Sequence, residues 1–202
     1  MTRSLPYVPL AKVYFPLRSR LRDGLFIVTG SLFIALLAQI AIPLPFTPVP
    51  ITLQTLGVLL VGAALGSRLG FWSVAAYLVE GALGLPFFAG GSGGLAVFVG
   101  PDAGYLLAFP LAAGLLGLLV EHFGADRRRL AMFLGMSLAS LLIYALGLLG
   151  LAIWSRAAGH PLSLGGLIAL GMLPFLLGDI LKALTAALLL PQVWRQVGRS
   201  TR

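Results

Sequence analysis

Six long runs of apolar residues, separated by short polar or proline-rich segments, dominate the pattern along this chain. They cover about residues 24–42, 51–67, 69–85, 103–121, 130–155 and 165–190. A helix that spans a bilayer needs about 20 mostly apolar residues, with a range of roughly 17–25. The runs are too long and too uniformly apolar for barrel strands. The pattern therefore predicts an all-α integral membrane protein, a single domain over residues 1–202 with six transmembrane helices.

The positions of the few charges add an orientation to this picture. Charged residues make up 10% of the chain, against about 25% in a soluble domain. If the spans alternate in direction, twelve of the fourteen basic residues fall on one side: Arg3, Lys12, Arg18, Arg20, Arg22, Arg68, Arg127, Arg128, Arg129, Arg195, Arg199 and Arg202. The positive-inside rule then predicts cytoplasmic termini, with residues 1–23 as a basic cytoplasmic segment. The net charge of +8 is thus attributed to topology and lipid head groups rather than to nucleic acid.

Composition also narrows the chemistry. The chain has no cysteine and two widely separated histidines, which excludes disulfides and thiolate sites and argues against a metal centre. The first apolar run is too long for a cleaved signal peptide, and Pro43 follows it instead of a small-residue cleavage site, so we expect a retained span. No lysine lies between Lys12 and Lys182, so no P-loop is present and no ATP site of the chain's own is expected.

Asp179 and Lys182 are the sharpest candidates for function, because they lie inside the sixth run and on one helix face. A charge at the bilayer centre costs about 2.5–3.5 kcal/mol on insertion scales, and such groups commonly mark functional sites. We expect the pair to face the interior and contact a ligand. The alternative is a structural ion pair, or a lysine that reaches the interface. Pro174 should kink this helix near Gly171 and favour a pocket in its outer half.

Further polar residues in the runs are candidate ligand contacts. Gln54, one turn into the second run, carries an amide that both donates and accepts, as a cyclic urea or another amide would require; a helix–helix hydrogen bond is the alternative. Tyr144, in the fifth run, needs a partner for its hydroxyl if it faces inward, and is otherwise a packing residue. Thr52 and Thr55 are expected to bond their own helix, and Glu80 to lie at the membrane interface.

Two other segments suggest contacts. Four prolines in the connector "IPLPFTPVPI" predict a stiff, extended strap over residues 42–51, held over a cavity. In the first run, Ser31 and Ala35 are small residues four positions apart, a spacing that lets another helix approach closely. We interpret these two as a docking face for a partner helix, with packing inside the chain as the alternative.

The glycine-rich stretch "FFAGGSGGLAVFVGPDAG", residues 87–104, admits two further interpretations. Ser92 in a G-x-S-G pattern is similar to the nucleophile of intramembrane serine proteases, but it lies in a predicted outer loop and no later span carries a histidine. The favoured interpretation is a flexible loop over a ligand, with Gly91, Ser92 and Gly93 in contact with it, because glycines allow close backbone approach.

Three stretches resemble the BioY family, the biotin-binding S components of energy-coupling factor (ECF) vitamin transporters. They are "PLPFTPVPITLQTLGVLLVGAALG", "GLPFFAGGSGGLAVFVGPDAGYLLAFPLAAGLLG" and, more loosely, "LPFLLGDILKALTA". The resemblance is contiguous over about residues 35–120. It implies a six-helix fold, Asp179 and Lys182 as ligand contacts, and loop closure around residues 90–94. Where the family often has a polar residue such as asparagine in the loop, this chain has Gly-Gly-Ser-Gly-Gly.

The resemblance also implies a role and partners. The chain would bind and import biotin without catalysis, with no cofactor of its own, in a prokaryotic cell membrane. It would join an EcfT-like transmembrane coupling protein and two ABC ATPases that use ATP, and Ser31 and Ala35 would fit the docking surface. The alternatives are a solo transporter, an S component for another vitamin and, from a different class, an intramembrane serine protease.

Overall fold

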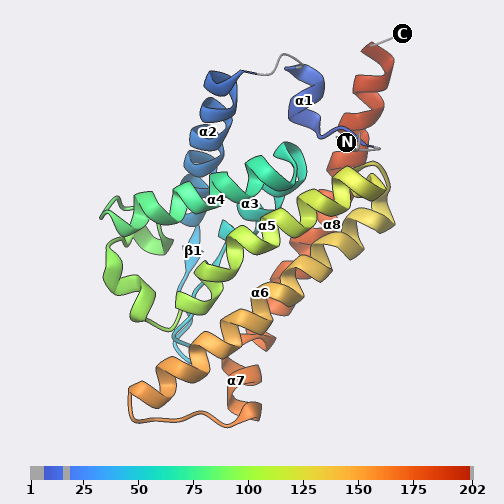
Figure 1. Cartoon of the computed structure of the whole chain (residues 1–202). Coiled ribbons are helices and arrows are strands. Elements are labelled where there is room, and N and C mark those ends of the chain that lie inside the picture. Colours follow the sequence, from blue (N-terminus) through green and yellow to red (C-terminus); the bar gives the residue numbers. More distant parts are fainter. Residues whose placement is uncertain (1–6, 16–18, 201–202) are drawn as a thin grey trace.

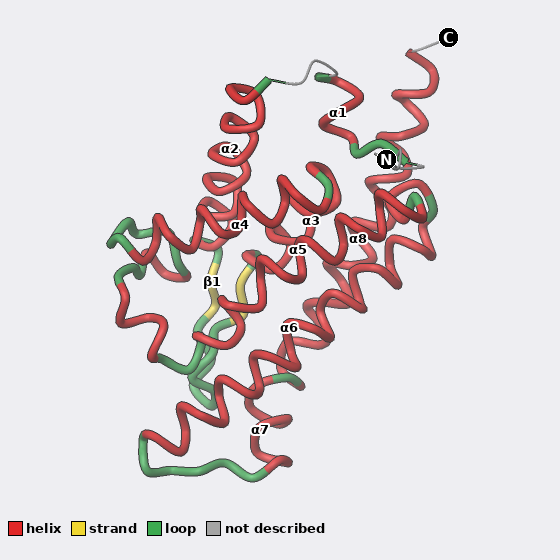
Figure 2. The backbone as a smooth tube through the Cα atoms, viewed as in Figure 1, coloured by secondary structure: helices red, strands yellow, loops and turns green. Residues whose placement is uncertain are grey.

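The computed structural model describes residues 7–15 and 19–200, with the side chains of residues 197–200 excepted. Helices dominate the chain, and two short strands lie near its middle (Figures 1 and 2). In chain order the elements are α1 (Leu10–Tyr14), α2 (Arg20–Ala38), β1 (Ala41–Ile42), β2 (Ile51–Thr52), α3 (Gln54–Leu65), α4 (Ser67–Ala82), the 3-10 turns η1 (Ala89–Gly91) and η2 (Leu95–Val99), α5 (Ala103–Phe123), η3 (Ala125–Arg127), α6 (Arg129–Ala157), α7 (Leu164–Gly171) and α8 (Leu173–Ser200).

The expectation of an all-α membrane bundle is confirmed, but the helices differ in reach. Within the described residues, α2, α5, α6 and α8 are long and apolar enough to cross a membrane. Helices α3 and α4 have only 12 and 16 residues, or about 18 and 24 Å at a rise of 1.5 Å per residue. The hydrocarbon core is about 30 Å thick. These two helices are therefore shorter than a full perpendicular crossing.

Glycines in the left-handed region set the sharpest turns between helices. Gly66, with φ of 85°, is the single residue between α3 and α4, so the two helices form a tight hairpin. Gly124, with φ of 60°, ends α5 and donates its N–H to the carbonyl of Val120. Such turns favour glycine because a side chain at positive φ is strained.

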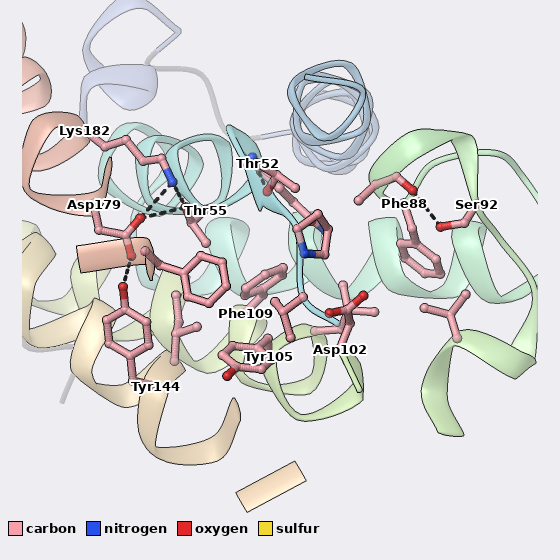
Figure 3. Close-up of a pocket in the computed structure, with 18 residues that line it drawn as sticks. Thr52, Thr55, Phe88, Ser92, Asp102, Tyr105, Phe109, Tyr144, Asp179 and Lys182 are labelled. Carbon is pink, nitrogen blue, oxygen red and sulfur yellow. Dashed lines mark hydrogen bonds and ion pairs between the residues drawn. The ribbon is translucent and has the colours of Figure 1, made fainter. Parts of the chain in front are cut away.

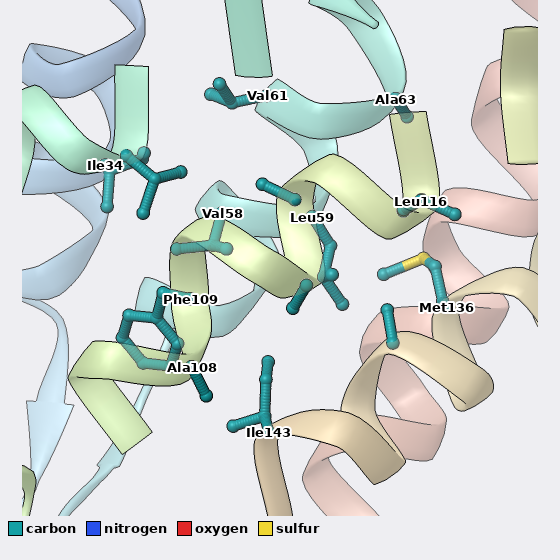
Figure 4. Close-up of a cluster of buried hydrophobic side chains, with 14 of the residues drawn as sticks. Ile34, Val58, Leu59, Val61, Ala63, Ala108, Phe109, Leu116, Met136 and Ile143 are labelled. Carbon is teal, nitrogen blue, oxygen red and sulfur yellow. The ribbon is translucent and has the colours of Figure 1, made fainter. Parts of the chain in front are cut away.

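Helix α3 occupies the centre of the bundle, with α2, α4, α5 and α8 packed around it. Helix α5 lies between α4 and α6, and α6 in turn packs along α8 (Figure 1). The core is apolar and joins four helices through Ile34, Val58, Leu59, Ala108, Phe109, Leu116, Met136 and Ile143 (Figure 4). Burial of these side chains within the bundle, rather than against lipid, fixes the relative positions of α2, α3, α5 and α6.

Glycines bring the central backbones into contact. A Cβ at Gly62 of α3 would lie 2.4 Å from the carbonyl oxygen of Ala113 in α5, and one at Gly70 of α4 would lie 2.8 Å from the Cα of Gly62. A Cβ at Gly150 of α6 would likewise lie 2.6 Å from the Cα of Gly104 in α5. Small residues at helix crossings allow this approach, which replaces the hydrophobic effect as a driving force in lipid.

The proposed docking face on the first helix is corrected by the structure. Ser31 is 0% exposed and Ala35 is 6% exposed, on the side of α2 that packs against α4. The Ser31 hydroxyl donates to a carboxylate oxygen of Glu80 at 2.7 Å, so Glu80 is also paired inside the chain. The small residues serve internal packing, which was the alternative. The exposed residues of α2 are large and apolar instead, among them Leu32 and Leu36.

One end of the molecule gathers α1, the α5–α6 turn and the far end of α8, opposite α7 (Figure 1). Buried Glu121 of α5 accepts a hydrogen bond from Ser67 at 2.5 Å and pairs with Lys12 of α1 at 3.6 Å. The guanidinium of Arg127 lies 4.2 Å from the ring centroid of Trp194 in α8, and Trp194 donates to Asp126. Polar contacts thus close this end, and the basic residues concentrate there.

The glycine contacts predict an asymmetric response to added methyl groups. Gly62→Ala should lower the free energy of unfolding by about 1–3 kcal/mol, because the methyl group meets fixed backbone of α5. Gly24→Ala, in α2 with nothing within 4 Å of the added Cβ, should be neutral or stabilising by up to about 1 kcal/mol through helix propensity. Thermal unfolding of the two purified variants in one detergent measures the difference. Equal melting temperatures would contradict the close approach.

Candidate ligand-binding pocket

The helix predicted over about residues 165–190 is broken into α7 and α8, whereas the sequence predicted only a kink near Gly171. Pro174 has no N–H to donate to the carbonyl of Leu170. Met172 leaves the helical conformation with φ of −134° and ψ of −55°, and the N–H of Phe175 bonds to Met172 instead of Gly171. Two backbone carbonyls, those of Leu170 and Gly171, are therefore left without their helical partners.

Side chains from two other segments satisfy these carbonyls. Thr47 of the proline-rich strap donates its hydroxyl to Leu170 at 2.7 Å, and Tyr105 of α5 donates to Gly171 at 2.7 Å. The strap is itself held by the antiparallel pairing of β1 with β2, in which Ala41 lies opposite Thr52. The two ends of the predicted extended connector thus pair as short antiparallel strands. Thr47, between them, bonds the connector to the broken helix.

A pocket lies between this break, the strap and the glycine-rich loop. About 660 Å³ of empty space lies between its walls, including space open to solvent at its mouth. Its polar lining comes from the first turns of α3 and α5, from the N-terminal third of α8, from Tyr144 of α6, and from Thr52 and Ser92. Its apolar lining includes Val49, Val97, Phe109, Ile143 and Phe175. The pocket therefore has apolar walls with polar groups at a few positions (Figure 3).

Asp179 and Lys182 form the first polar group, and the structure brings Tyr144 and Thr55 to them. The Lys182 ammonium donates to Asp179 Oδ1 at 2.8 Å and to Thr55 Oγ1 at 2.8 Å. Tyr144 donates its hydroxyl to the other Asp179 oxygen. Their side chains are only 12% and 15% exposed, for Lys182 and Asp179 respectively. The ion pair is thus positioned by α3 and α6, and it faces the pocket rather than lipid.

This arrangement leaves Lys182 able to bind an anion. An ammonium group has three N–H donors, and the described contacts of Lys182 use two of them. Because Asp179 neutralises the lysine in the protein alone, the pair lowers the cost of carrying a charge at this depth. Thr55 therefore takes part in the site, whereas sequence reasoning had assigned it to its own helix. Thr52, two residues before Gln54, accepts the N–H of Gln54 at the start of α3 at 3.2 Å.

Gln54 lines the pocket and also serves the packing role that was its alternative. Its side chain is buried, and its amide nitrogen donates to the hydroxyl of Tyr77 at 2.6 Å. The hydroxyl of Tyr77 in turn donates to the carbonyl of Phe87 at 3.1 Å. The amide of Gln54 thus anchors the start of the glycine-rich loop, and among the described groups none donates to its carbonyl oxygen.

The glycine-rich loop contributes fewer contacts than expected. Of its predicted ligand contacts, only Ser92 lines the pocket, and Gly91 and Gly93 do not. A Cβ at Gly93 would lie 2.4 Å from the carbonyl oxygen of Leu85, so Gly93 is required by the fold of the loop itself. Gly91 has φ of 75°, a turn conformation that favours glycine. The aromatic ring of Phe88 is 2% exposed and anchors the loop to the apolar core.

Ser92 has no catalytic surroundings. Its hydroxyl donates to the carbonyl of Ala89 at 2.9 Å, and the residues that line the pocket include no histidine. A serine nucleophile needs an adjacent base to take its proton, and the described hydroxyl contact of Ser92 is to a backbone carbonyl instead.

Sequence reasoning missed Asp102, the only ionisable residue of residues 87–104. It lies at the N-terminus of α5, lines the pocket and makes no capping hydrogen bond to its own helix. Burial raises the pKa of its carboxyl group to about 6. The available signal was a lone acid in an apolar loop next to a predicted span, but a charge at a span boundary has no evident cost from sequence alone.

Comparison with known proteins identifies the family of this pocket. A family model described as the BioY family matches residues 10–199. The chain belongs to the BioY family. It is 44% identical over 170 residues to a biotin transporter BioY of Rhodobacter capsulatus, a match that covers 82% of this chain and 87% of that protein. It is 38% identical over 165 residues to a BioY of Thermotoga maritima, covering 81% and 92%.

A solved structure extends the BioY similarity to the whole fold. The crystal structure of the S-component for biotin from an ECF-type ABC transporter matches with a TM-score of 0.76 and 27% sequence identity. The match covers 89% of this chain and 95% of that one. The chain is thus a multi-pass membrane protein with the fold of an S component, a transporter family rather than an enzyme family.

The hydrogen bond from the strap to the helix break predicts a stability effect. Thr47→Val removes the donor to the Leu170 carbonyl and the acceptor for the Val49 N–H. It should lower the free energy of unfolding by about 1–3 kcal/mol, the cost of leaving such groups unpaired. Thr185→Val is the matched control, because that hydroxyl is exposed and bonds its own helix at Leu181. If thermal unfolding of the two variants is the same, the strap does not depend on this contact.

Proposed function

We propose that this chain binds biotin in the pocket and imports it as the substrate-specific S component of an ECF-type transporter. The observation that carries this proposal is the Asp179–Lys182 pair at one end of an oily pocket. Biotin has a carboxylate on an apolar chain and a bicyclic body that ends in a urea. A lysine with a remaining donor, apolar walls and further polar groups fit these three parts.

Within this proposal, Lys182 binds the ligand carboxylate and Asp179 holds Lys182 in place. Asp179 accepts from both Tyr144 and Lys182, so its oxygens are engaged in positioning. The relatives described as biotin transporters support biotin over other anionic vitamins, as does the solved S component for biotin. Gln54 and Ser92 remain proposed contacts along the pocket wall.

The proposal extends to orientation and partners. Lys12 belongs to α1 and Arg127 to η3, the turn between α5 and α6. Helix α1 and that turn lie at the end of the molecule away from α7 (Figure 1). By the positive-inside rule that end and both termini are cytoplasmic. The pocket is lined by the opposite ends of α3, α5 and α8, and so faces outward, in a prokaryotic cell membrane. Since the sequence carries no P-loop, energy would come from ABC ATPases through an EcfT-like coupling protein, with which the exposed apolar face of α2 is available for contact.

Biotin titration of a lysine variant tests the binding site. Lys182→Met keeps the apolar stem and removes the ammonium, so biotin affinity should fall roughly 30-fold or more, the effect of about 2 kcal/mol for an unpaired buried charge. Biotin methyl ester, which lacks the carboxylate charge, should lose much less. Arg156→Met removes a cation outside the pocket and should leave affinity unchanged. Unaltered biotin binding by Lys182→Met would refute the carboxylate assignment.

Uptake measurements separate the ECF proposal from a solo transporter. We expect cells that express the chain together with an ECF module to accumulate labelled biotin at low external concentration. A module whose ATPases carry substituted P-loop lysines should abolish that uptake while binding persists. Accumulation that is equally rapid without any module would favour a solo transporter.

A further inference from the structure

The end of the molecule away from the pocket carries a basic surface that ligand binding does not explain. This surface, the basic rim, consists of Arg127, Arg128 and Arg129, where α5 turns into α6, and of Arg195 near the end of α8. All four side chains are exposed. The turn η3 packs against α8, and Figure 1 shows the two beside each other and close to α1. Segments far apart in the sequence thus bring four cations to one edge of the bundle.

Aromatic rings hold the first arginine of the rim in place. The guanidinium of Arg127 lies 4.2 Å from the ring centroid of Trp194 and 4.9 Å from that of Tyr7. Its Nη2 atom also donates to the carbonyl of Val8 at 3.4 Å. Such cation–π contacts join the α5–α6 turn both to α8 and to the segment before α1. The backbone under the rim is therefore tied to two other parts of the chain.

The acids next to the rim do not neutralise it. Glu121 and Asp126 are only 4% and 1% exposed. Glu121 pairs with Lys12, and Asp126 accepts a hydrogen bond from Trp194. In the part of the chain that the structure describes, no side-chain hydrogen bond or ion pair is made by Arg128, Arg129 and Arg195. The positive charge of the rim is thus available to an anion from outside the chain.

An apolar stripe begins directly beside the rim and follows α6. This leucine stripe consists of four exposed side chains, those of Leu130, Leu134, Leu138 and Leu141. Their spacing of four, four and three residues places them on one face of the helix. Helix α6 is long and apolar enough to cross a membrane, so this face can lie against acyl chains. An arginine cluster at the head of an apolar stripe matches the two parts of a phospholipid.

We propose that the basic rim binds an anionic phospholipid, with the lipid phosphate at Arg128, Arg129 and Arg195 and an acyl chain along the leucine stripe. The inference requires only that the chain spans a membrane, and it does not depend on biotin as the transported ligand. Guanidinium groups bind phosphate through parallel N–H donors. Basic sites between transmembrane helices bind anionic head groups in this way. Trp194 and Tyr7 are of the residue types enriched at the level of the head groups.

The charge balance of the rim favours an anionic lipid over a zwitterionic one. A zwitterionic head group would bring a cation toward the arginines together with its phosphate, and no exposed carboxylate of the described α5–α6 turn could receive that cation. A head group with net negative charge adds attraction without this repulsion. A lipid bound in this way would connect the start of α6 with the end of α8 on the outside of the bundle.

Quenching of tryptophan fluorescence by brominated lipids tests the site in the whole chain. The chain has three tryptophans, and the substitutions Trp72→Phe and Trp154→Phe leave Trp194 as the reporter beside the rim. This parent protein is reconstituted into vesicles of mixed phosphatidylcholine and phosphatidylglycerol, with bromine on the acyl chains of one lipid or of the other. We expect brominated phosphatidylglycerol to quench Trp194 more strongly at equal mole fraction. The two quenching curves give the ratio of the binding constants.

Two pairs of arginine substitutions with the same change in charge then locate the site. Arg128→Gln/Arg129→Gln should lower the preference for phosphatidylglycerol by about fivefold for each arginine removed, until no preference remains. Arg128→Lys/Arg129→Lys keeps the charge and should retain most of the preference. Arg20→Gln/Arg68→Gln, at the starts of α2 and α4, should leave the ratio unchanged. Cooperative thermal unfolding in phosphatidylcholine alone, at the melting temperature of the parent, shows that each variant is folded.

Other results would overturn the inference. Equal quenching by the two brominated lipids in the parent, or an undiminished preference in folded Arg128→Gln/Arg129→Gln, would remove the lipid from the rim. An equal loss in Arg20→Gln/Arg68→Gln would attribute the preference to the overall charge of the chain. Loss of the preference when sodium phosphate replaces sodium chloride at constant ionic strength would assign the rim to a free phosphate ion.

Discussion

The pocket exists because one proline stops a transmembrane helix from continuing. Without an N–H at Pro174, the carbonyl of Leu170 loses its helical partner, and the break at Met172 releases that of Gly171 as well. Unpaired backbone groups are not tolerated facing lipid, so they must be satisfied by protein. Thr47 and Tyr105 provide the donors. The same two hydrogen bonds therefore draw the strap and the start of α5 against α8, and the pocket lies where these three elements meet.

The bundle makes this local feature rigid. Helix α3 is short and central, and its glycine contacts with α4 and α5 hold Gln54 and Thr55 at a fixed depth. Those two residues then serve opposite sides of the site: Gln54 secures the loop through Tyr77, and Thr55 accepts from Lys182. A ligand that contacts α3, α5 and α8 would thus meet groups that cannot shift independently. Such preorganisation reduces the entropy lost on binding.

The sequence was sufficient for features that follow from the cost of polarity in lipid. The pairing of Asp179 with Lys182 could be predicted because a charge within an apolar run requires a partner. The position of the break near Pro174 was also predicted, although a kink was expected there instead of a break. Other features had no such signal. Ser31 and Ala35 fit either an external or an internal helix contact, and only the position of α4 decides between them. Gly91 and Gly93 signal a turn but not whether a ligand touches it. Asp102 stands at the edge of a loop, and the sequence alone does not show that folding places it in the lining of the pocket.

The two ends of the pocket differ in how their buried charges are neutralised. At the α8 end, Asp179 neutralises Lys182 within the protein, so the site is stable without a ligand and a carboxylate has only to join an existing pair. At the α5 end, Asp102 has no internal donor among the described residues, and its burial is a cost that the ligand-free fold carries.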